Sequence, residues 1–284
     1  MSGADYFDDS YAINPYMDEK VAIDTQKATA EHQNIQQLLE SIGVTVSKVA
    51  PPKDCQDGVY TANWALCNNG VAVLSRLPGP RKNEEPYAQQ ALEALGLKTV
   101  QIPEELRFSG QGDALPCGDL LFAGSVYRTD VAVHDFLRDT LGLRVISLQT
   151  VPKRRWGTFG KPITNTTSGW PDSLFYDIDL ALAVLRVPSS STKGLIAWCP
   201  RAFTKQSRSV LRALNDVDKI EVNIHEAVNG FACNLVSNGE AVVMSAHAPK
   251  LQAELAKRGF QTLTPEISEL AKGGGYIRCT TLTL

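Results

Sequence analysis

Four short segments of this 284-residue chain combine residue types that can do chemistry. The C-terminal one, residues 273–280, reads Gly-Gly-Gly-Tyr-Ile-Arg-Cys-Thr. Three glycines allow the backbone to approach a ligand closely, and a thiol at such a place can act as a nucleophile in its thiolate form. Cys279 is therefore a candidate nucleophile, although a lone cysteine is more commonly a small buried spacer.

The second segment carries two acids. Residues 176–179 read Tyr-Asp-Ile-Asp and lie inside the apolar run 174–187. In a strand, Asp177 and Asp179 would point to the same face, and two carboxylates in an apolar setting are costly unless a cation neutralises them. The pair therefore indicates a site for a cation; if no metal or ligand separates the two acids, one carboxyl should have a raised pKa. The alternative is an exposed helix N-terminus, where acids suit the dipole.

The other two segments are weaker signals. Residues 108–113 read Phe-Ser-Gly-Gln-Gly-Asp, in which the glycines would aim Asp113 from a tight turn; an ordinary β-turn explains the pattern equally well. Residues 127–130 read Tyr-Arg-Thr-Asp at a predicted strand-to-helix junction. There Arg128 could hold a carboxylate in a bidentate fork, while a surface ion pair is the simpler interpretation.

The elements that must position these segments alternate along the whole chain. Hydrophobic patterning predicts strands at 45–49, 71–75, 98–102, 120–123, 144–148, 195–198, 221–224, 231–236, 241–245 and 276–284. It predicts helices at 24–42, 85–95, 130–141, 204–214 and 248–258. This alternation indicates the α/β class, and no long linker divides the chain, so we expect a single domain over 1–284. Residues 152–171 show no period and are predicted to be a long loop, either a binding element or a mobile insertion.

Composition narrows the class of function. The chain has 28 basic and 31 acidic residues and a net charge of −3, which argues against a nucleic-acid partner. No run approaches the roughly 18 apolar residues of a membrane span, and the polar start argues against a signal peptide, so we expect a cytoplasmic protein. The six cysteines form no Cys-x-x-Cys pair. We expect no metal, no cofactor, and a small-molecule substrate as the partner; an oligomer is possible.

Taken together, the four segments occur in the order found in the guanidino-group-modifying superfamily, which contains arginine deiminases, dimethylarginine dimethylaminohydrolases, arginine dihydrolases and amidinotransferases. The resemblance begins at residues 11–17 (Tyr-Ala-Ile-Asn-Pro-Tyr-Met) and continues to the C-terminal cysteine. Residues 60–64 resemble the family's early substrate-contact strand, and residues 232–235 resemble a late structural strand. The resemblance implies an α/β propeller with pseudo-fivefold ββαβ modules around a central polar channel.

The activity implied by the resemblance is nucleophilic substitution at a guanidinium carbon. By position, Cys279 would be the nucleophile and Asp179 would bind the guanidinium through charge-assisted hydrogen bonds. Arg128 would lie near a substrate carboxylate. The remaining implied substrate-binding positions are Asn14, Asn63, Ser109 and Asp113.

Two positions depart from the family pattern. Asp177 stands where the family has its acid/base histidine, and Ser109 stands where an acid commonly orients that histidine; the four histidines of the chain lie outside the site segments. An aspartate with its ordinary pKa near 3.9 is a poor proton donor at neutral pH, so we predict slow or absent hydrolysis of arginine. The leading interpretation is a cysteine-dependent hydrolase or transferase whose catalytic residues are Cys279 and a modified acid/base group, Asp177. The alternative is a non-hydrolytic descendant, either a binding protein or a catalyst of cyclisation or rearrangement.

Overall fold

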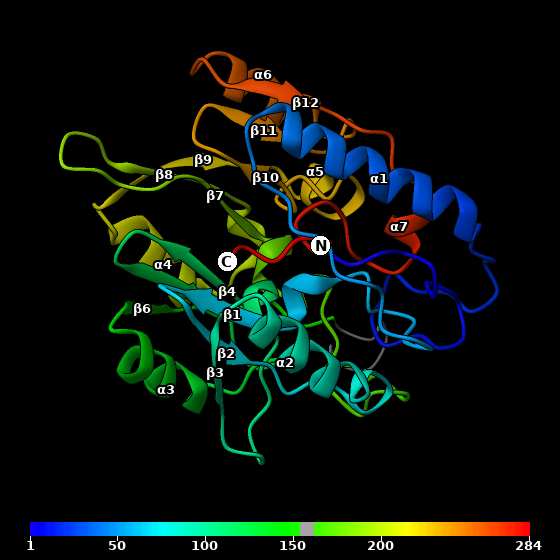
Figure 1. Ribbon diagram of the computed structural model, residues 1–284. Helices are drawn as coiled ribbons and strands as arrows, with labels where there is room; N and C mark the ends of the chain where they lie inside the picture. The colour runs from blue at the N-terminus through cyan, green and yellow to red at the C-terminus, as the bar shows by residue number, and fades with distance from the viewer. Residues whose placement is uncertain (154–161) are drawn as a thin grey trace.

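The computed structural model describes residues 1–153 and 162–284. Within them the chain forms four separate three-stranded sheets, which Figure 1 shows arranged around the centre of the molecule, where the C-terminal segment runs. Helices lie outside the sheets, and the third strand of each sheet is farther from the centre than the first. The strands differ in burial in the same way. The middle strand β5 is buried throughout, whereas the third strands β3 and β6 have exposed ends.

Each sheet repeats one unit: an antiparallel hairpin, a helix, and a third strand parallel to the second. The first unit is β1 (Ala65–Asn68), β2 (Val71–Leu74), α2 (Glu84–Ala94) and β3 (Lys98–Gln101). The second is β4 (Ala114–Cys117), β5 (Leu120–Ala123), α3 (Ala132–Leu141) and β6 (Arg144–Ser147). The third is β7 (Leu182–Arg186), β8 (Gly194–Trp198), α4 (Lys205–Ala213) and β9 (Val217–Glu221). The fourth is β10 (Val236–Ser237), β11 (Ala241–Val243), α6 (Pro249–Ala256) and β12 (Gln261–Leu263).

Three further helices complete the described chain: α1 (Thr25–Ser41), α5 (Ile224–Asn229) and α7 (Glu269–Lys272). The buried carboxylate of Glu31 on α1 accepts hydrogen bonds from the backbone N–H groups of Ser268, Glu269 and Leu270 at 2.8–3.0 Å. A carboxylate at the start of a helix satisfies donors that have no partner inside the helix. This contact fixes the chain just before the glycines that lead to Cys279.

The α/β class and the ββαβ unit are confirmed, while the fivefold arrangement and the single domain stay predictions. The five predicted helices correspond to α1, α2, α3, α4 and α6. Four predicted strands are wrong in whole or part. Residues 45–49 contribute only a bridge between Val49 and Ser2, and the strand predicted at 221–224 is β9, which ends at Glu221. Residues 231–235 and 276–280 form turns, although both segments are rich in apolar residues.

The predicted loop 152–171 falls partly outside the described residues, which omit 154–161. Its later part closes on itself through an antiparallel bridge between Thr164 and Pro171. Among the described residues, no helix has both the length and the apolar character required to cross a membrane.

Candidate active site

The site segments lie in the turns that lead into the first strand of successive units. Short 3-10 helices occupy Thr61–Asn63 before β1, Gly110–Gly112 before β4 and Ile178–Leu180 before β7. These turns end at the centre of the molecule, so side chains far apart in the sequence meet there. Asp177 and Asp179 therefore sit at a 3-10 turn and not in the predicted strand. They are 1 % and 0 % exposed, which rules out the exposed helix N-terminus that was the alternative.

The thiol of Cys279 contacts one of these acids. Its Sγ lies 3.4 Å from Oδ2 of Asp179 and accepts a hydrogen bond from Nδ2 of Asn234 at 3.1 Å. The other end of the Asn234 amide, Oδ1, accepts the backbone N–H groups of Cys279 at 3.1 Å and Tyr276 at 3.2 Å. One side chain thus both folds the turn that carries the nucleophile and contacts its sulfur.

Burial sets the ionisation of this thiol. Cys279 is 2 % exposed, and loss of solvent followed by the charge of Asp179 raises its pKa well above the ordinary value. Hydrogen bonds from Tyr276 and Asn234 oppose this shift without overcoming it. In the ligand-free site the sulfur is therefore a neutral thiol at neutral pH.

Burial also raises the pKa values of three aspartates at the site. Burial, then the charge of Asp177, raises the pKa of Asp113 to about 8. The pKa of Asp179 is raised well above its usual range by burial and by Asp177. The pKa of Asp177 is also raised by burial, although Arg128 opposes the shift.

Three carboxyl oxygens in this cluster face no protein donor. Oδ2 of Asp113, Oδ1 of Asp177 and Oδ1 of Asp179 are buried and make no hydrogen bond within the described chain. Buried acceptors without a partner are costly, so the cluster favours a ligand that is both cationic and rich in N–H donors. No group of three or more His, Cys, Asp or Glu side chains in the described residues has a metal-binding arrangement.

The second oxygen of Asp177 belongs to a chain of oriented groups. Nη1 of Arg81 donates to Oδ1 of Asn63 at 2.8 Å, which turns the Asn63 amide so that Nδ2 donates to Oδ2 of Asp177 at 2.8 Å and to Oγ of Ser109 at 2.9 Å. Arg81 is itself held by Glu84 through two hydrogen bonds of 2.8 and 2.7 Å. Gly112 is required beside this network, because a Cβ there would lie 2.6 Å from Oδ2 of Asp177.

Arg128 is buried rather than a member of a surface ion pair. Its Nη2 donates to the carbonyl of Ile13 at 2.8 Å, and its guanidinium lies 4.8 Å from the ring centre of Tyr176 and 5.9 Å from that of Trp170. No carboxylate lies within 4 Å of it in the described residues, so its charge is available to a ligand. This cation–π stacking orients the guanidinium plane.

Asn14 meets the glycine segment instead of the acids. Its Nδ2 donates to the carbonyl of Gly273 at 2.9 Å, and its Oδ1 accepts the backbone N–H of Tyr16 at 3.0 Å. The next residue, Gly274, has φ of +83°, and a Cβ on it would lie 2.4 Å from Oδ1 of Asn14. Asn14 thus packs directly on the backbone that leads to the nucleophile.

Two of these residues escaped the sequence analysis. Asn234 lies in residues 232–235, which were predicted to be a structural strand; the signal was one amide inside an apolar run. Arg81 precedes Glu84 by three residues in a charged stretch, which resembles an exposed ion pair. Only the fold reveals that both are buried beside the site.

Comparison with known proteins matches this sequence and this fold to one family. The family model described as "N,N dimethylarginine dimethylhydrolase, eukaryotic" matches residues 8–284. The N(G),N(G)-dimethylarginine dimethylaminohydrolase of Mycobacterium tuberculosis is 33% identical over 280 residues, covering 98% of this chain and 83% of that protein. The bifunctional arginine dihydrolase/ornithine cyclodeaminase AgrE of Nostoc is 31% identical over 99% of this chain, which spans only 37% of that longer protein.

Solved structures agree with the sequence relatives. The N-terminal domain of the cyanobacterial arginine dihydrolase ArgZ, in a mutant bound to substrate, superposes with a TM-score of 0.83 at 29% identity, covering 99% of this chain and 96% of that domain. Another structure of the same domain, described as covalently bonded to a reaction intermediate, also gives 0.83, at 28% identity over 99% of this chain and 95% of that one. By sequence and by fold, the chain belongs to the dimethylarginine dimethylaminohydrolase family.

Proposed function

We propose that this protein is a hydrolase that cleaves a guanidino C–N bond of an arginine-like small molecule through a covalent adduct on Cys279. The observation that carries the proposal is the position of the Cys279 sulfur 3.4 Å from Asp179, beside buried carboxyl oxygens of Asp177 and Asp179 that have no partner in the described chain. A guanidinium is a planar cation with N–H donors on every edge, and it fits both the charge and the hydrogen-bonding needs of this cluster.

Binding of that cation would also prepare the nucleophile. A positive charge beside Asp179 and Cys279 favours their ionised forms, so it opposes the burial that keeps the free thiol protonated. The substrate then supplies part of the electrostatic assistance that an imidazolium gives in relatives with a histidine. An uncharged analogue lacks this effect.

In the proposed reaction, the Cys279 thiolate attacks the guanidinium carbon and forms a C–S bond. The C–N bond to the leaving amine breaks as that nitrogen takes a proton from the Asp177 carboxyl; burial raises the pKa of this carboxyl, which favours its protonated form. Water then adds to the thiouronium adduct and gives a proton back to Asp177. Collapse of this intermediate breaks the C–S bond, regenerates the thiolate and releases a neutral ureido product, while its hydroxyl proton is taken up by the released amine.

The remaining site residues have supporting roles in the proposal. Arg128, buried and without a carboxylate partner in the described chain, would hold the carboxylate of the substrate. Asn63 and Ser109 would keep Asp177 in position, Asp113 would support the turn after it through the Ile178 N–H at 2.9 Å, and Asn14 would hold the glycine backbone. The relatives are hydrolases by name, which favours turnover over the non-hydrolytic alternative.

The test is a search for the adduct and for the amine released. Purified protein is incubated with L-arginine or asymmetric dimethylarginine, quenched in acid, and the peptide that contains Cys279 is examined by mass spectrometry; free ammonia and dimethylamine are measured in parallel. We expect a thiouronium mass on Cys279 and release of one amine, both lost in Cys279→Ser. Cys117→Ser, at another buried cysteine, is the matched control and should keep both.

The amine identifies the substrate subclass, because dimethylamine indicates a methylated arginine and ammonia indicates arginine itself. Binding of both compounds with neither adduct nor amine, from pH 6 to pH 10, would overturn the proposed hydrolase.

A further inference from the structure

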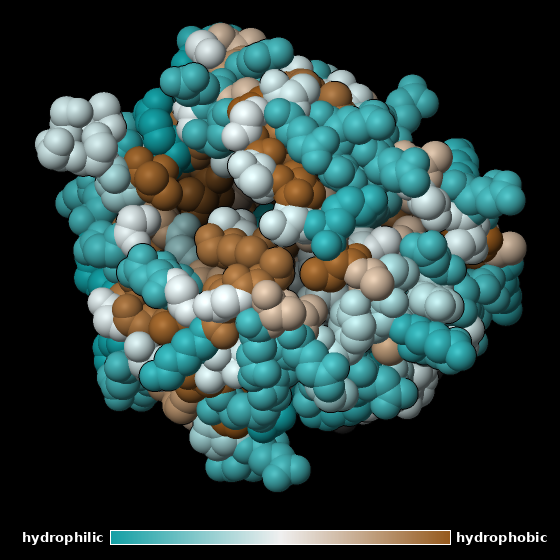
Figure 2. Space-filling view, in the orientation of Figure 1, coloured by the Kyte–Doolittle hydropathy of each residue, from teal (hydrophilic) through white to brown (hydrophobic). Residues whose placement is uncertain are grey.

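A second cavity lies on the other side of the turn that carries Cys279. It has a volume of about 340 Å³ and is bounded by β7, β10 and the C-terminal residues, and Arg278, not Cys279, faces it. On the face shown in Figure 2 the molecule is hollowed near its centre, with apolar residues around the hollow. We call the 340 Å³ cavity lined by Arg278 the tail-side cavity.

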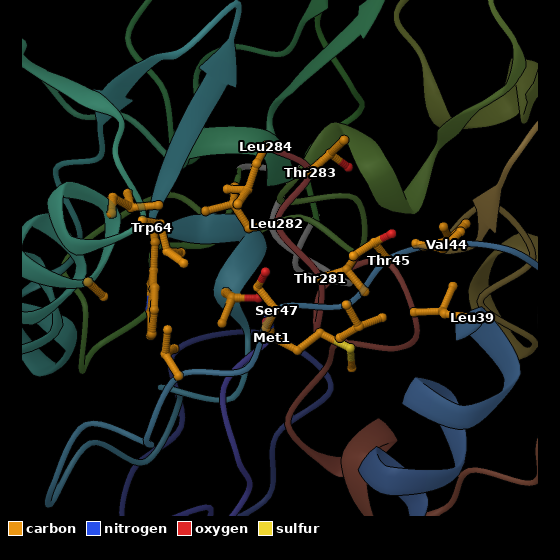
Figure 3. Close-up of a pocket in the computed structure, with 17 residues that line it drawn as sticks. Met1, Leu39, Val44, Thr45, Ser47, Trp64, Thr281, Leu282, Thr283 and Leu284 are labelled. Atoms are coloured by element: carbon orange, nitrogen blue, oxygen red, sulfur yellow. The ribbon is translucent and has the colours of Figure 1, made fainter.

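A neighbouring pocket differs from the tail-side cavity in the charge of the side chains that line it. Figure 3 shows that pocket, which shares Thr283 and Leu284 with the tail-side cavity but is lined by no charged side chain. The C-terminal segment thus runs between two hollows, one apolar and one that contains a guanidinium. Of the two, only the second is lined by a charged side chain.

The guanidinium of Arg278 is held by neutral groups. Nη2 donates to Oε1 of Gln111 at 2.7 Å, and Nη1 donates to Oγ1 of Thr281 at 3.1 Å and to its carbonyl at 3.2 Å. No carboxylate of the described chain lies within 4 Å of it. These acceptors fix the orientation of the guanidinium but leave its charge without a counter-ion, which is unfavourable in a partly buried site.

Two further donors line the same cavity. Asn68 and Asn69 form the end of the β1–β2 hairpin, and their side-chain amides make no hydrogen bond to any residue that the structure describes. The other walls are mainly apolar and include the aliphatic side chains of Leu182, Val184 and Leu235. A mainly apolar cavity of this size with a few convergent polar groups is typical of a small-molecule site.

We propose that the tail-side cavity binds a small aliphatic carboxylate, of about four to six carbon atoms, whose carboxylate pairs with Arg278 and whose chain packs on the aliphatic wall. A carboxylate supplies the missing counter-ion and matches the planar fork of the guanidinium. The alkyl chain accounts for the rest of the lining. The site is distinct from the one proposed for the guanidino substrate, and its existence does not depend on that function.

Such a ligand would act on the active site through charge. The guanidinium of Arg278 opposes the rise in the pKa of Asp179, and it favours the ionised forms of Asp179 and Cys279. An anion paired with Arg278 cancels this favourable field, so both Asp179 and Cys279 hold their protons more firmly. Occupancy of the tail-side cavity would therefore lower the reactivity of the thiol and inhibit the enzyme.

The binding test uses isovalerate as the probe, with isovaleramide to remove the charge and acetate to remove the chain. Val184→Phe fills the cavity, and Val210→Phe on the exposed face of α4 is the matched control. By calorimetry or saturation-transfer NMR we expect saturable binding of isovalerate to the wild type and to Val210→Phe, and binding about tenfold weaker or worse for Val184→Phe and for both other probes. Equal binding to Val184→Phe, or no saturable binding to the wild type, overturns the site.

A second variant, Asn69→Asp, tests the site even if Val184→Phe does not fold. Asn69 is exposed with φ of +48°, a conformation that aspartate also tolerates, so Asn69→Asp should fold while it adds a negative charge at the cavity. It should weaken isovalerate binding and leave the weak binding of isovaleramide unchanged. Equal losses for both probes would contradict recognition of charge.

The inhibition is tested separately, by the rate at which neutral iodoacetamide alkylates Cys279. Saturating isovalerate should slow this rate about threefold or more in the wild type, because a change of half a pKa unit alters the thiolate fraction by that factor, and should not change it in Val184→Phe. Binding without any change in alkylation would refute the inhibition and leave the site. Failure of the guanidino-hydrolase proposal would instead appear as absence of the Cys279 adduct.

Discussion

At the scale of single residues, the proposed reaction depends on how a proton is held at Asp177. We predict that Asp177 takes the place of the family's histidine, and burial raises its pKa, which favours the protonated form that a proton donor needs. The Arg81–Asn63 pair keeps one of its oxygens as an acceptor and leaves the other facing the site. Sequence reasoning could name the substitution, but it could not show this orientation.

Restoring the histidine tests whether the rest of the pocket is intact. In Asp177→His combined with Ser109→Glu, an imidazole with a pKa near neutrality would protonate the leaving amine, and we expect kcat for arginine-like substrates to rise about 10²-fold. Steady-state release of amine measures the change. Ser109→Gln with Asp177→His is the matched control, which keeps the size but lacks the orienting charge; an equal gain in both would show that a charged partner is not required.

Asp113 gives stability a dependence on pH. Its pKa is about 8 in the folded protein, against 3.8 as the ordinary value, so between these values the folded state binds more protons than the unfolded state. Stability therefore falls as pH rises through this range. Asp113→Asn removes the cost of ionising this buried carboxyl. Its free energy of unfolding, relative to that of the wild type, should therefore increase from pH 5 to pH 8 by at least about 1 kcal/mol.

Urea unfolding at the two pH values measures this difference. Asp18→Asn, at an exposed aspartate near the N-terminus, is the control and should show no such growth. A constant difference between Asp113→Asn and wild type would mean that Asp113 is ionised throughout.

At the scale of elements, turns rather than strands carry the chemistry. The α-helices were predictable, because their apolar stripes face the sheets and glycines stop them, as Gly142 does with φ of +67° after α3. Residues 231–235 and 276–280 were mistaken for strands because their apolar composition is that of a buried strand. What folds them as turns is tertiary contact, in which the Asn234 amide binds the N–H groups of Tyr276 and Cys279. The local sequence pattern does not predict such a contact.

The glycine turn before Cys279 is open to a matched test. Gly274 and Gly259 have nearly the same φ, +83° and +82°, but a Cβ on Gly259 meets nothing within 4 Å while one on Gly274 meets Asn14 at 2.4 Å. Gly259→Ala should lose about 1 kcal/mol of stability from backbone strain alone. Gly274→Ala should lose more and should also lower kcat/KM, because the turn that carries the sulfur must shift; equal effects on stability and no effect on activity would contradict this.

At the scale of the molecule, the site brings together segments from near both ends and from the middle of the chain. The peptide carbonyl of Ile13, the amide of Asn63, the acids at 177 and 179 and the thiol of Cys279 come from segments separated by up to 266 positions along the sequence. The resemblance to a known family could predict that these residues lie close together, since it implies the fold. The burial that sets their protonation follows only from the packed structure.

A ligand held by so many segments should stabilise the whole chain. In Cys279→Ser, which cannot turn over, saturating L-arginine should raise the melting temperature by about 5–10 °C, since a ligand at a hundred times its Kd adds about 2.7 kcal/mol. L-citrulline has the same backbone but an uncharged ureido group, so it leaves the buried acids without a cation and should give a much smaller shift. Adding Asp179→Asn should reduce the arginine shift toward that of citrulline. Equal shifts for the two amino acids would show that the acids do not recognise charge, and thermal unfolding followed by fluorescence distinguishes these outcomes.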